Sequence, residues 1–297
     1  MRPSARLFPL LLPAVLGGCF DFDATTAGGP LLDAAGGGSD ATVPLDSGGA
    51  DTNVGPAPDG GSYCASLPAS AGVVFCDDFD EGSLGSHWSA SYNTGGALAE
   101  TDASFESAPN SLDQTINQLQ AGDPVNVALR KLPIAVPPLP KTLLFGFSIE
   151  PIQIDPSPQG AIVLAALDFL DDAAPNPNRY SIELSINVQS AAAAMVLAEQ
   201  TGFSDGGAGA YQPHPLDPTH PLAMTTWTDL VIAIRWTAPT TAQASVSVKG
   251  GPELLSSVPL TMTVQATHLQ IAIGTSYVYE PSPRWELRYD NVSLEMQ

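Results

Sequence analysis

The segment 202–224 concentrates side chains that could bind a metal ion or a ligand. Tyr211, His214, Asp217 and His220 stand there among glycines and prolines. Imidazoles and a carboxylate are ligands that zinc accepts, but this spacing matches no established zinc site. The spacing favours the alternative, a surface loop whose histidines are solvated. Long loops in compact domains often bind ligands, so the segment stays a candidate for ligand contact.

Tyrosines form the second group of candidate residues. Sugars stack on exposed aromatic rings, because such rings are apolar on their faces and polar at one end. The predicted ligand-binding residues are Tyr92, Tyr211, Tyr277 and Tyr279, which lie in expected loops or beside the proline turn at 281–283. Aromatic residues make up only 7% of the chain, which is low for a dedicated polysaccharide binder.

The composition limits the classes of partner. The chain has 10 Lys and Arg against 31 Asp and Glu, which gives a net charge of −21. This charge argues against nucleic acid and against direct electrostatic binding to anionic lipid. A solvated acidic exterior explains the excess more simply than a dedicated cation store. With 44% apolar residues, the 297-residue chain can form one large β domain or two small ones.

Residues 1–18 have the pattern of an export signal. Arg2 and Arg6 precede an apolar run that is too short to span a bilayer. The run ends in Leu-Gly-Gly followed by Cys19, which resembles the bacterial lipobox. That resemblance implies cleavage before Cys19, lipidation of this cysteine and anchoring in the cell envelope, with the outer membrane as the expected membrane. The alternative is an ordinary secretory signal with a stray cysteine.

The next segment, 19–62, is predicted to be a disordered tether. Between residues 20 and 62 there are seven Asp and no Lys or Arg, with many Gly, Ala and Pro. Such a composition cannot bury enough apolar surface to offset the entropy of ordering the chain. The folded domain is therefore expected at 63–297.

If Cys19 carries lipid, only Cys64 and Cys76 remain to pair. Export makes their oxidation favourable, and so short a loop contributes roughly 2–3 kcal/mol when closed. The alternative, two free thiols beside a metal ion, has no nearby histidine to support it. A structural disulfide is the prediction.

From residue 73 onward, apolar and polar residues alternate as they do in half-buried strands. The clearest stretch is 180–188, and the same period recurs at 125–129, 143–149, 230–236, 244–248 and 269–273. Trp236 and Trp285 share the phase of aliphatic neighbours and are predicted to be core. Only 191–199 is alanine-rich enough for a short helix. The pattern predicts an all-β fold, a two-sheet antiparallel β-sandwich.

The last predicted strand, 285–296, changes phase in its middle. Trp285 and Leu287 share one phase, whereas Val292 and later apolar residues follow the other. A bulge at Asp290 and Asn291 would let both halves face the same core and would re-aim the Asp290 carboxylate.

Several short motifs, taken in order, resemble those of concanavalin A-like jelly rolls of the laminin-G, legume-lectin and laminarinase type. The matching stretches are 75–80 with Trp88, 107–112, 227–232, 244–251, 269–274 and 289–292. The resemblance covers about 73–297 and implies two curved sheets, one face of which often binds glycans. It implies fold more firmly than function, because function depends on individual sites.

The enzymes of that superfamily provide a residue-level test of catalysis. Laminarinase-type hydrolases carry Glu-x-Asp-x-x-Glu on one strand, because two carboxylates must flank the scissile bond. Glu183 and Glu286 have no such partner. Alginate lyases carry Gln-x-His on a strand; Gln212 and His214 match these letters, but their proline-rich surroundings predict a loop. With no other established catalytic motif present, catalysis is disfavoured.

The resemblance also implies a metal site at the chain ends. First and last strands are neighbours in this fold, and several families hold calcium there. Asp78 or Asp80 with Asp290 could supply hard oxygen ligands. The alternative is that Asp290 caps the bulge by accepting hydrogen bonds from backbone N–H groups.

The sequence therefore predicts a non-catalytic, lipid-anchored envelope protein that binds glycans or another surface ligand. A structural or adhesion module that binds another envelope protein is the alternative. A polysaccharide hydrolase or lyase with an atypical site is the third hypothesis.

Overall fold

A computed structural model describes residues 62–297 apart from 69–70, 81–82, 85, 118–124, 137–140, 156–160, 172–178, 188–193, 202–209, 239–240, 263–265 and 276–283. The signal peptide, Cys19 and nearly all of the tether lie outside the described residues, as do Tyr277 and Tyr279. Within the described part of the chain, no helix is long and apolar enough to cross a membrane.

The described chain is built almost entirely from β-strands, as the alternating pattern predicts. Its single described helix is the one-turn α1 (Tyr63–Ser66). The strands are β1 (Val73–Asp77), β2 (Ala90–Thr94), β3 (Gly96–Thr101), β4 (Ser111–Ile116), β5 (Asn126–Ala135), β6 (Thr142–Ile154), β7 (Ala161–Leu170), β8 (Arg179–Asn187), β9 (Ala194–Thr201), β10 (Ala210–Pro215), β11 (Thr228–Ala238), β12 (Thr241–Val248), β13 (Glu253–Leu260), β14 (His268–Thr275) and β15 (Trp285–Met296).

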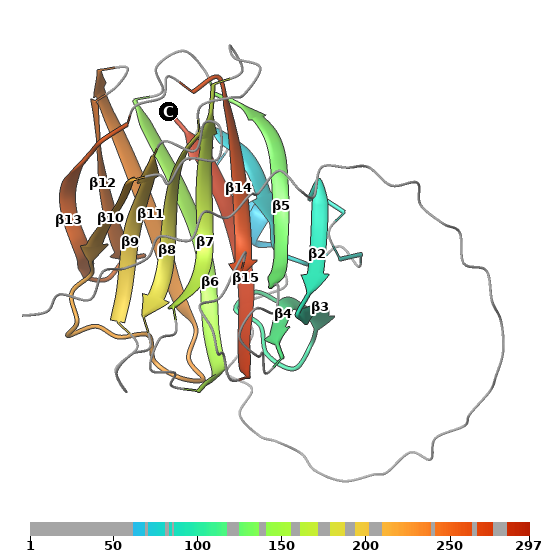
Figure 1. Cartoon of the computed structure of the whole chain (residues 1–297). Helices are drawn as coiled ribbons and strands as arrows, with labels where there is room; N and C mark the ends of the chain where they lie inside the picture. The colour runs from blue at the N-terminus through green and yellow to red at the C-terminus, as the bar shows by residue number, and fades with distance from the viewer. Residues whose placement is uncertain are drawn as a thin grey trace, which may run out of the picture.

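The strands form two antiparallel sheets packed face to face (Figure 1). One sheet has eight strands in the order β13-β12-β11-β6-β15-β4-β3, with β1 also paired to β15. The other has seven strands in the order β10-β9-β8-β7-β14-β5-β2. Sequence-distant strands such as β2, β5 and β14 therefore lie side by side. The predicted two-sheet sandwich is confirmed.

The core lies between the two sheets and is filled by alternate residues of each strand. On β8, Tyr180, Ile182 and Leu184 are fully buried in this core. Trp285 of β15 is also fully buried, and Trp236 of β11 packs against the core, as their phases predict. Because side chains alternate across a strand, the residues between these positions point to the outer face of their sheet.

The predicted bulge in the last strand is present. The register between β15 and β6 shifts between Asp290 and Ser293, and Asn291 has φ 53°. Asparagine tolerates this left-handed conformation better than most residues. As a result, Tyr289 before the bulge and Val292 after it are both fully buried.

Two local predictions are wrong. The alanine-rich segment 191–199 is not a helix in its described part, because Met195 and Leu197 alternate toward the core within strand β9. Gln212 and His214 lie on strand β10 and not in a loop. This strand tolerates its prolines because it is the edge of the seven-stranded sheet and pairs only with β9.

The predicted disulfide between Cys64 and Cys76 is present, with the two Cα atoms 5.7 Å apart. It ties α1 to β1, which pairs with the second half of β15. Asp78 adds a second link, because its Oδ2 accepts hydrogen bonds from the Ser62 hydroxyl and from the backbone N–H of Cys64. The beginning of the domain is therefore fastened to its end.

Candidate functional site

The outer face of the seven-stranded sheet carries a row of polar side chains at right angles to the strands. Strand pairing places five residues in register across β14, β7, β8, β9 and β10, namely Gln270, Asp168, Ser181, Gln200 and Tyr211. Neighbouring strands lie about 4.8 Å apart, so this row extends over roughly 20 Å. We call these five residues, together with Arg179, Glu183, Arg130 and Tyr92, the polar face.

Asp168 is the centre of the polar face. Its carboxylate is almost completely buried, at 3% exposure. Arg179 donates to it through Nε and lies 2.8 Å from Oδ2 through Nη2. Ser181 donates to Oδ1, and the side-chain amide of Gln270 donates to Oδ2 over 2.8 Å. Strands β8 and β14, the two neighbours of β7, therefore both bond to the same carboxylate.

A second polar pair lies beside the first. Glu183 faces outward from β8 and accepts a hydrogen bond of 2.7 Å from the side-chain amide of Gln200. Glu183 is 5% exposed, whereas Gln200 is half-buried. The amide of Gln200 is thus held in place between the carboxylate of Glu183 and the exposed ring of Tyr211.

Arg130 and Tyr92 extend the polar face toward the opposite edge. Arg130 pairs in register with Ala272 of β14 and with Ala90 of β2, and its guanidinium carbon lies 4.7 Å from the centre of the Tyr92 ring. Burial lowers the pKa of the Arg130 guanidinium, and the nearby carboxylate of Asp168 partly offsets this effect. Arginine nevertheless remains charged at neutral pH.

Between these polar groups the face has short side chains. Ala272, Ala166, Glu183 and Ala198 form a second row in register, next to the polar row. Val163, Ala166 and Ala272 make a small apolar cluster that is separate from the main core. Because the alanine side chains are short, the polar groups of the neighbouring row protrude beyond them. The row provides amide, carboxylate, hydroxyl and aromatic groups along one line, and the guanidinium groups of Arg179 and Arg130 lie beside it.

The structure brings two of the predicted tyrosines onto this face. Tyr211 is 55% exposed on β10, and Tyr92 is half-buried on β2 at the other edge of the sheet. Both were expected in loops, but both lie on edge strands of the sheet. The other two predicted tyrosines, Tyr277 and Tyr279, fall outside the described residues.

His214 points away from the polar face, toward the interior of the sandwich. Its Nε2 lies 2.6 Å from Glu199, a fully buried carboxylate that also accepts hydrogen bonds from Tyr180 and Thr261. Burial alone would raise the pKa of Glu199, but these hydrogen bonds lower it below its ordinary value. Glu199 therefore links β8, β9 and β10 to the residue that follows β13 of the other sheet.

The other residues of the predicted zinc set lie elsewhere. His220 Nδ1 lies 3.2 Å from Asp217 Oδ2, and both side chains are exposed. His214 is bonded to Glu199 and not to either of them. In the described ranges, no group of three or more His, Cys, Asp or Glu residues is placed to hold a metal ion.

Asp290 is surrounded by backbone donors. Its two oxygens accept hydrogen bonds from the N–H groups of Glu106, Ser107 and Asn291, at 2.7–2.9 Å. Burial raises the pKa of Asp290 to about 8, although these hydrogen bonds act in the opposite direction. Asp80 accepts from the backbone N–H of Asn110. The geometry matches the capping role; calcium binding by Asp78, Asp80 and Asp290 stays a prediction.

Sequence reasoning missed Arg130, Asp168, Arg179 and Gln270 as candidate site residues. The available signal was the presence of charged residues at outward positions of strands with otherwise apolar or small residues, as with Asp168 in β7. That signal does not show which strands are neighbours. The polar face forms because β7 pairs with β14, which lies about a hundred residues further along the chain.

Neither a protein-family model nor a curated protein sequence matches the chain. Solved structures do share its fold. An endo-beta-1,4-glucuronan lyase from the fungus Trichoderma reesei is 12% identical, with a TM-score of 0.54 over 76% of this chain and 96% of that one. An alginate lyase from Aplysia kurodai is 9% identical, with a TM-score of 0.53 over 76% of this chain and 99% of that one. At these identities the likeness shows the fold alone, a jelly-roll β-sandwich of the concanavalin-like kind.

Proposed function

We propose that this protein binds an acidic polysaccharide across the polar face. The observation that carries the proposal is the row from Gln270 to Tyr211, which crosses five neighbouring strands in register. A straight row of hydrogen-bonding groups beside short side chains suits an extended polymer better than a compact ligand. The exposed ring of Tyr211 at its end can stack on a sugar ring.

The charges of the polar face allow an acidic polymer to bind, in contrast to the rest of the acidic surface. Arg130 and Arg179 balance Asp168 and Glu183 there, whereas the whole chain has a net charge of −21. The polar face is therefore much less repulsive to anions than the average surface. Guanidinium groups also bind carboxylates through two parallel hydrogen bonds. The names of the two fold neighbours, a glucuronan lyase and an alginate lyase, agree with this choice.

Binding can be measured by titrating the purified protein with alginate and polyglucuronate, using a neutral glucan for comparison. We expect the acidic polymers to bind and Arg179→Gln to weaken their binding by about tenfold, because one charge-assisted contact is lost. The matched control is Arg235→Gln, since Arg235 is an exposed arginine on β11 of the other sheet. Binding of the acidic polymers that Arg179→Gln leaves unchanged, or an equal loss in the control, would contradict the proposal.

A polysaccharide lyase is the second candidate function, and the contact between Tyr92 and Arg130 favours it. In such an elimination, a phenolate removes the proton next to the uronate carboxylate while a guanidinium neutralises that carboxylate. The C–O bond to the leaving glycosidic oxygen then breaks, a double bond forms in the sugar ring, and the leaving oxygen takes up the proton that the phenol now carries. The support for assigning these two roles to Tyr92 and Arg130 is that the Arg130 guanidinium carbon lies 4.7 Å from the centre of the Tyr92 ring. The test is the ultraviolet absorbance of the unsaturated product, which Tyr92→Phe must abolish.

We further propose that the domain is exported and held in the cell envelope through lipid on Cys19. The support is the sequence pattern at residues 1–19. Mass spectrometry of the mature amino terminus tests it directly: an acylated Cys19 supports the anchor, and an unmodified or differently cleaved terminus contradicts it. An envelope protein as partner remains the alternative if neither acidic nor neutral glycans bind.

A further inference from the structure

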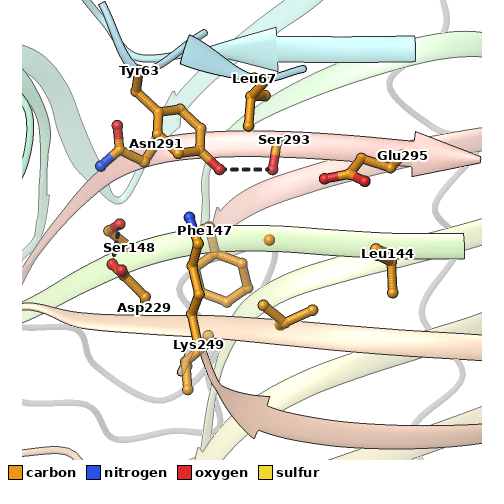
Figure 2. Close-up of a pocket in the computed structure, with 13 residues that line it drawn as sticks. Tyr63, Leu67, Leu144, Phe147, Ser148, Asp229, Lys249, Asn291, Ser293 and Glu295 are labelled. Carbon is orange, nitrogen blue, oxygen red and sulfur yellow. Dashed lines mark hydrogen bonds between the residues drawn. The ribbon is translucent and has the colours of Figure 1, made fainter. Parts of the chain in front are cut away.

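A cavity lies on the side of the molecule opposite the polar face, on the outer face of the eight-stranded sheet (Figure 2). Its volume is about 270 Å³. The floor is formed by β15, β6 and β11, and one wall is formed by α1. We call it the α1 pocket. The residues used below to argue its chemistry are Tyr63, Gly146, Ser148, Asp229, Lys249 and Ser293.

The pocket exists because a glycine lies at the centre of its floor. Gly146 of β6 pairs in register with Ser293 of β15 on one side and with Val231 of β11 on the other. A Cβ atom at this position would lie 3.1 Å from the Ser293 hydroxyl oxygen. The missing side chain leaves a hollow between the side chains of the two neighbouring strands.

The aromatic wall of the pocket is held firmly. Figure 2 shows Tyr63 reaching from α1 toward Ser293, and the two hydroxyl oxygens are 3.2 Å apart. The disulfide of Cys64, the next residue, fixes α1 to β1. Lys249 approaches the same ring, with Nζ 5.0 Å from its centre. Tyr63 is therefore fixed in position before a ligand binds, which reduces the entropy lost on binding.

Polar and apolar groups occupy different ends of the pocket. Ser148 and Asp229 lie at one end, joined by a hydrogen bond of 2.6 Å from the serine hydroxyl to Oδ1 of the carboxylate. Leu67 and Leu144 lie toward the other end, near the carboxylate of Glu295. Lys249 can donate hydrogen bonds to a ligand and Asp229 can accept them, whereas the leucines can offer a ligand only apolar surface.

We propose that the α1 pocket binds one neutral sugar residue. Its volume is below the roughly 300–1,000 Å³ typical of pockets for drug-sized ligands, so a single ring is the appropriate size. A sugar ring has an apolar face for Tyr63 and hydroxyl groups for Lys249, Asp229 and Ser148. The pocket is lined by two carboxylates, Asp229 and Glu295, and by one ammonium group, that of Lys249. Its net negative charge disfavours an anionic sugar.

This site differs from the polar face in both location and ligand charge, so its test is independent. The purified protein is titrated by calorimetry with methyl glucoside, methyl galactoside, methyl mannoside and N-acetylglucosamine, and with glucuronic acid for contrast. We expect at least one neutral sugar to bind and glucuronic acid not to compete with it. Lys249→Met should weaken that binding about tenfold or more, because a charged donor is lost.

Controls separate the pocket from general effects on folding. Lys141→Met changes another exposed lysine that does not line the pocket and should bind as the unaltered protein does. Tyr63→Ala should weaken neutral-sugar binding and leave alginate binding unchanged, with thermal melting used to confirm folding. Failure of every neutral sugar to bind the folded protein would overturn the proposal, as would binding that survives both Lys249→Met and Tyr63→Ala.

Discussion

Replacement of Asp168 by asparagine should make the protein less stable and, at the same time, a better binder of acidic polymers. The substitution keeps the size of the side chain but removes the charge that Arg179 pairs with. In the unaltered protein, Arg179, Ser181 and Gln270 all donate hydrogen bonds to the Asp168 carboxylate. The asparagine N–H₂ group would add a further donor where an acceptor is needed.

The magnitude follows from the burial of the two partners. Breaking a buried ion pair costs about 3–5 kcal/mol, because the remaining charge stays in a poor environment. The Arg179 side chain is 20% exposed and can regain some water, so we expect the lower limit of that range, about 3 kcal/mol. With a urea m-value of roughly 2–3 kcal/mol/M, the unfolding midpoint should fall by about 1–1.5 M.

The effect on binding has the opposite sign. Asp168→Asn removes one negative charge and frees the Arg179 guanidinium, at the expense of its fixed position. We expect the charge effect to be the larger one, so affinity for alginate should rise by roughly tenfold for one improved charge contact. Urea unfolding followed by tryptophan fluorescence gives the stability, and calorimetry with alginate gives the affinity. An unchanged urea midpoint would refute the buried-pair argument. A loss of affinity in a folded variant would mean that Asp168 itself contacts the ligand. Unchanged affinity would mean that the ligand binds elsewhere.

Removal of the disulfide by Cys64→Ala and Cys76→Ala together should lower the free energy of unfolding, measured in urea, by roughly 2–3 kcal/mol. An unchanged free energy of unfolding would show that the disulfide between α1 and β1 does not stabilise the domain. The lowered pKa of Glu199 means that its ionised form stabilises the fold above about pH 4.5, and that this stability is lost as the pH falls through the folded-state pKa. Urea midpoints of the unaltered protein should therefore fall more steeply with acid than those of Glu199→Gln, and parallel curves would contradict this. The calcium prediction is tested by melting with calcium and with chelator: a calcium-dependent rise that Asp290→Asn removes supports the site, whereas unchanged melting supports the capping role of Asp290 alone.

The sequence was sufficient to predict the fold because burial imposes a two-residue period on every strand. Tyr180, Ile182 and Leu184 reveal their strand without knowledge of its neighbours. The bulge at Asp290 was also predictable, since a change of phase within one strand has few other solutions. The errors fell where local propensity and tertiary structure disagree. Alanines near residue 194 favour a helix alone, but packing of Met195 and Leu197 in the core determines a strand.

The candidate sites were less predictable, because the order of the strands in each sheet determines which residues lie next to one another. Asp168 and Gln270 are 102 positions apart, and only the pairing of β7 with β14 makes them partners. The α1 pocket depends likewise on the register that places Gly146 between Ser293 and Val231. A sequence pattern shows which face of a strand a residue occupies, but it does not show which strand lies next to it. Tyr92 and Tyr211 were selected because they were expected in loops, and they reach the polar face from edge strands instead.

Stability alone does not account for the polar face. A buried ion pair such as Asp168 and Arg179 generally contributes no more to folding than well-packed apolar side chains of similar volume. The rest of the sheet shows that apolar and small residues fit here, since Val163, Ala166 and Ala272 pack together on the same face. What the ion pair provides, and apolar packing would not, is a guanidinium held at a fixed position beside Ser181, Gln200 and Gln270. A group that is already positioned loses little entropy when a ligand binds. The polar face therefore has the properties of a preformed binding surface. Its cost in stability is measured by replacing both Asp168 and Arg179 with apolar residues, whereas Asp168→Asn measures the effect of breaking the pair.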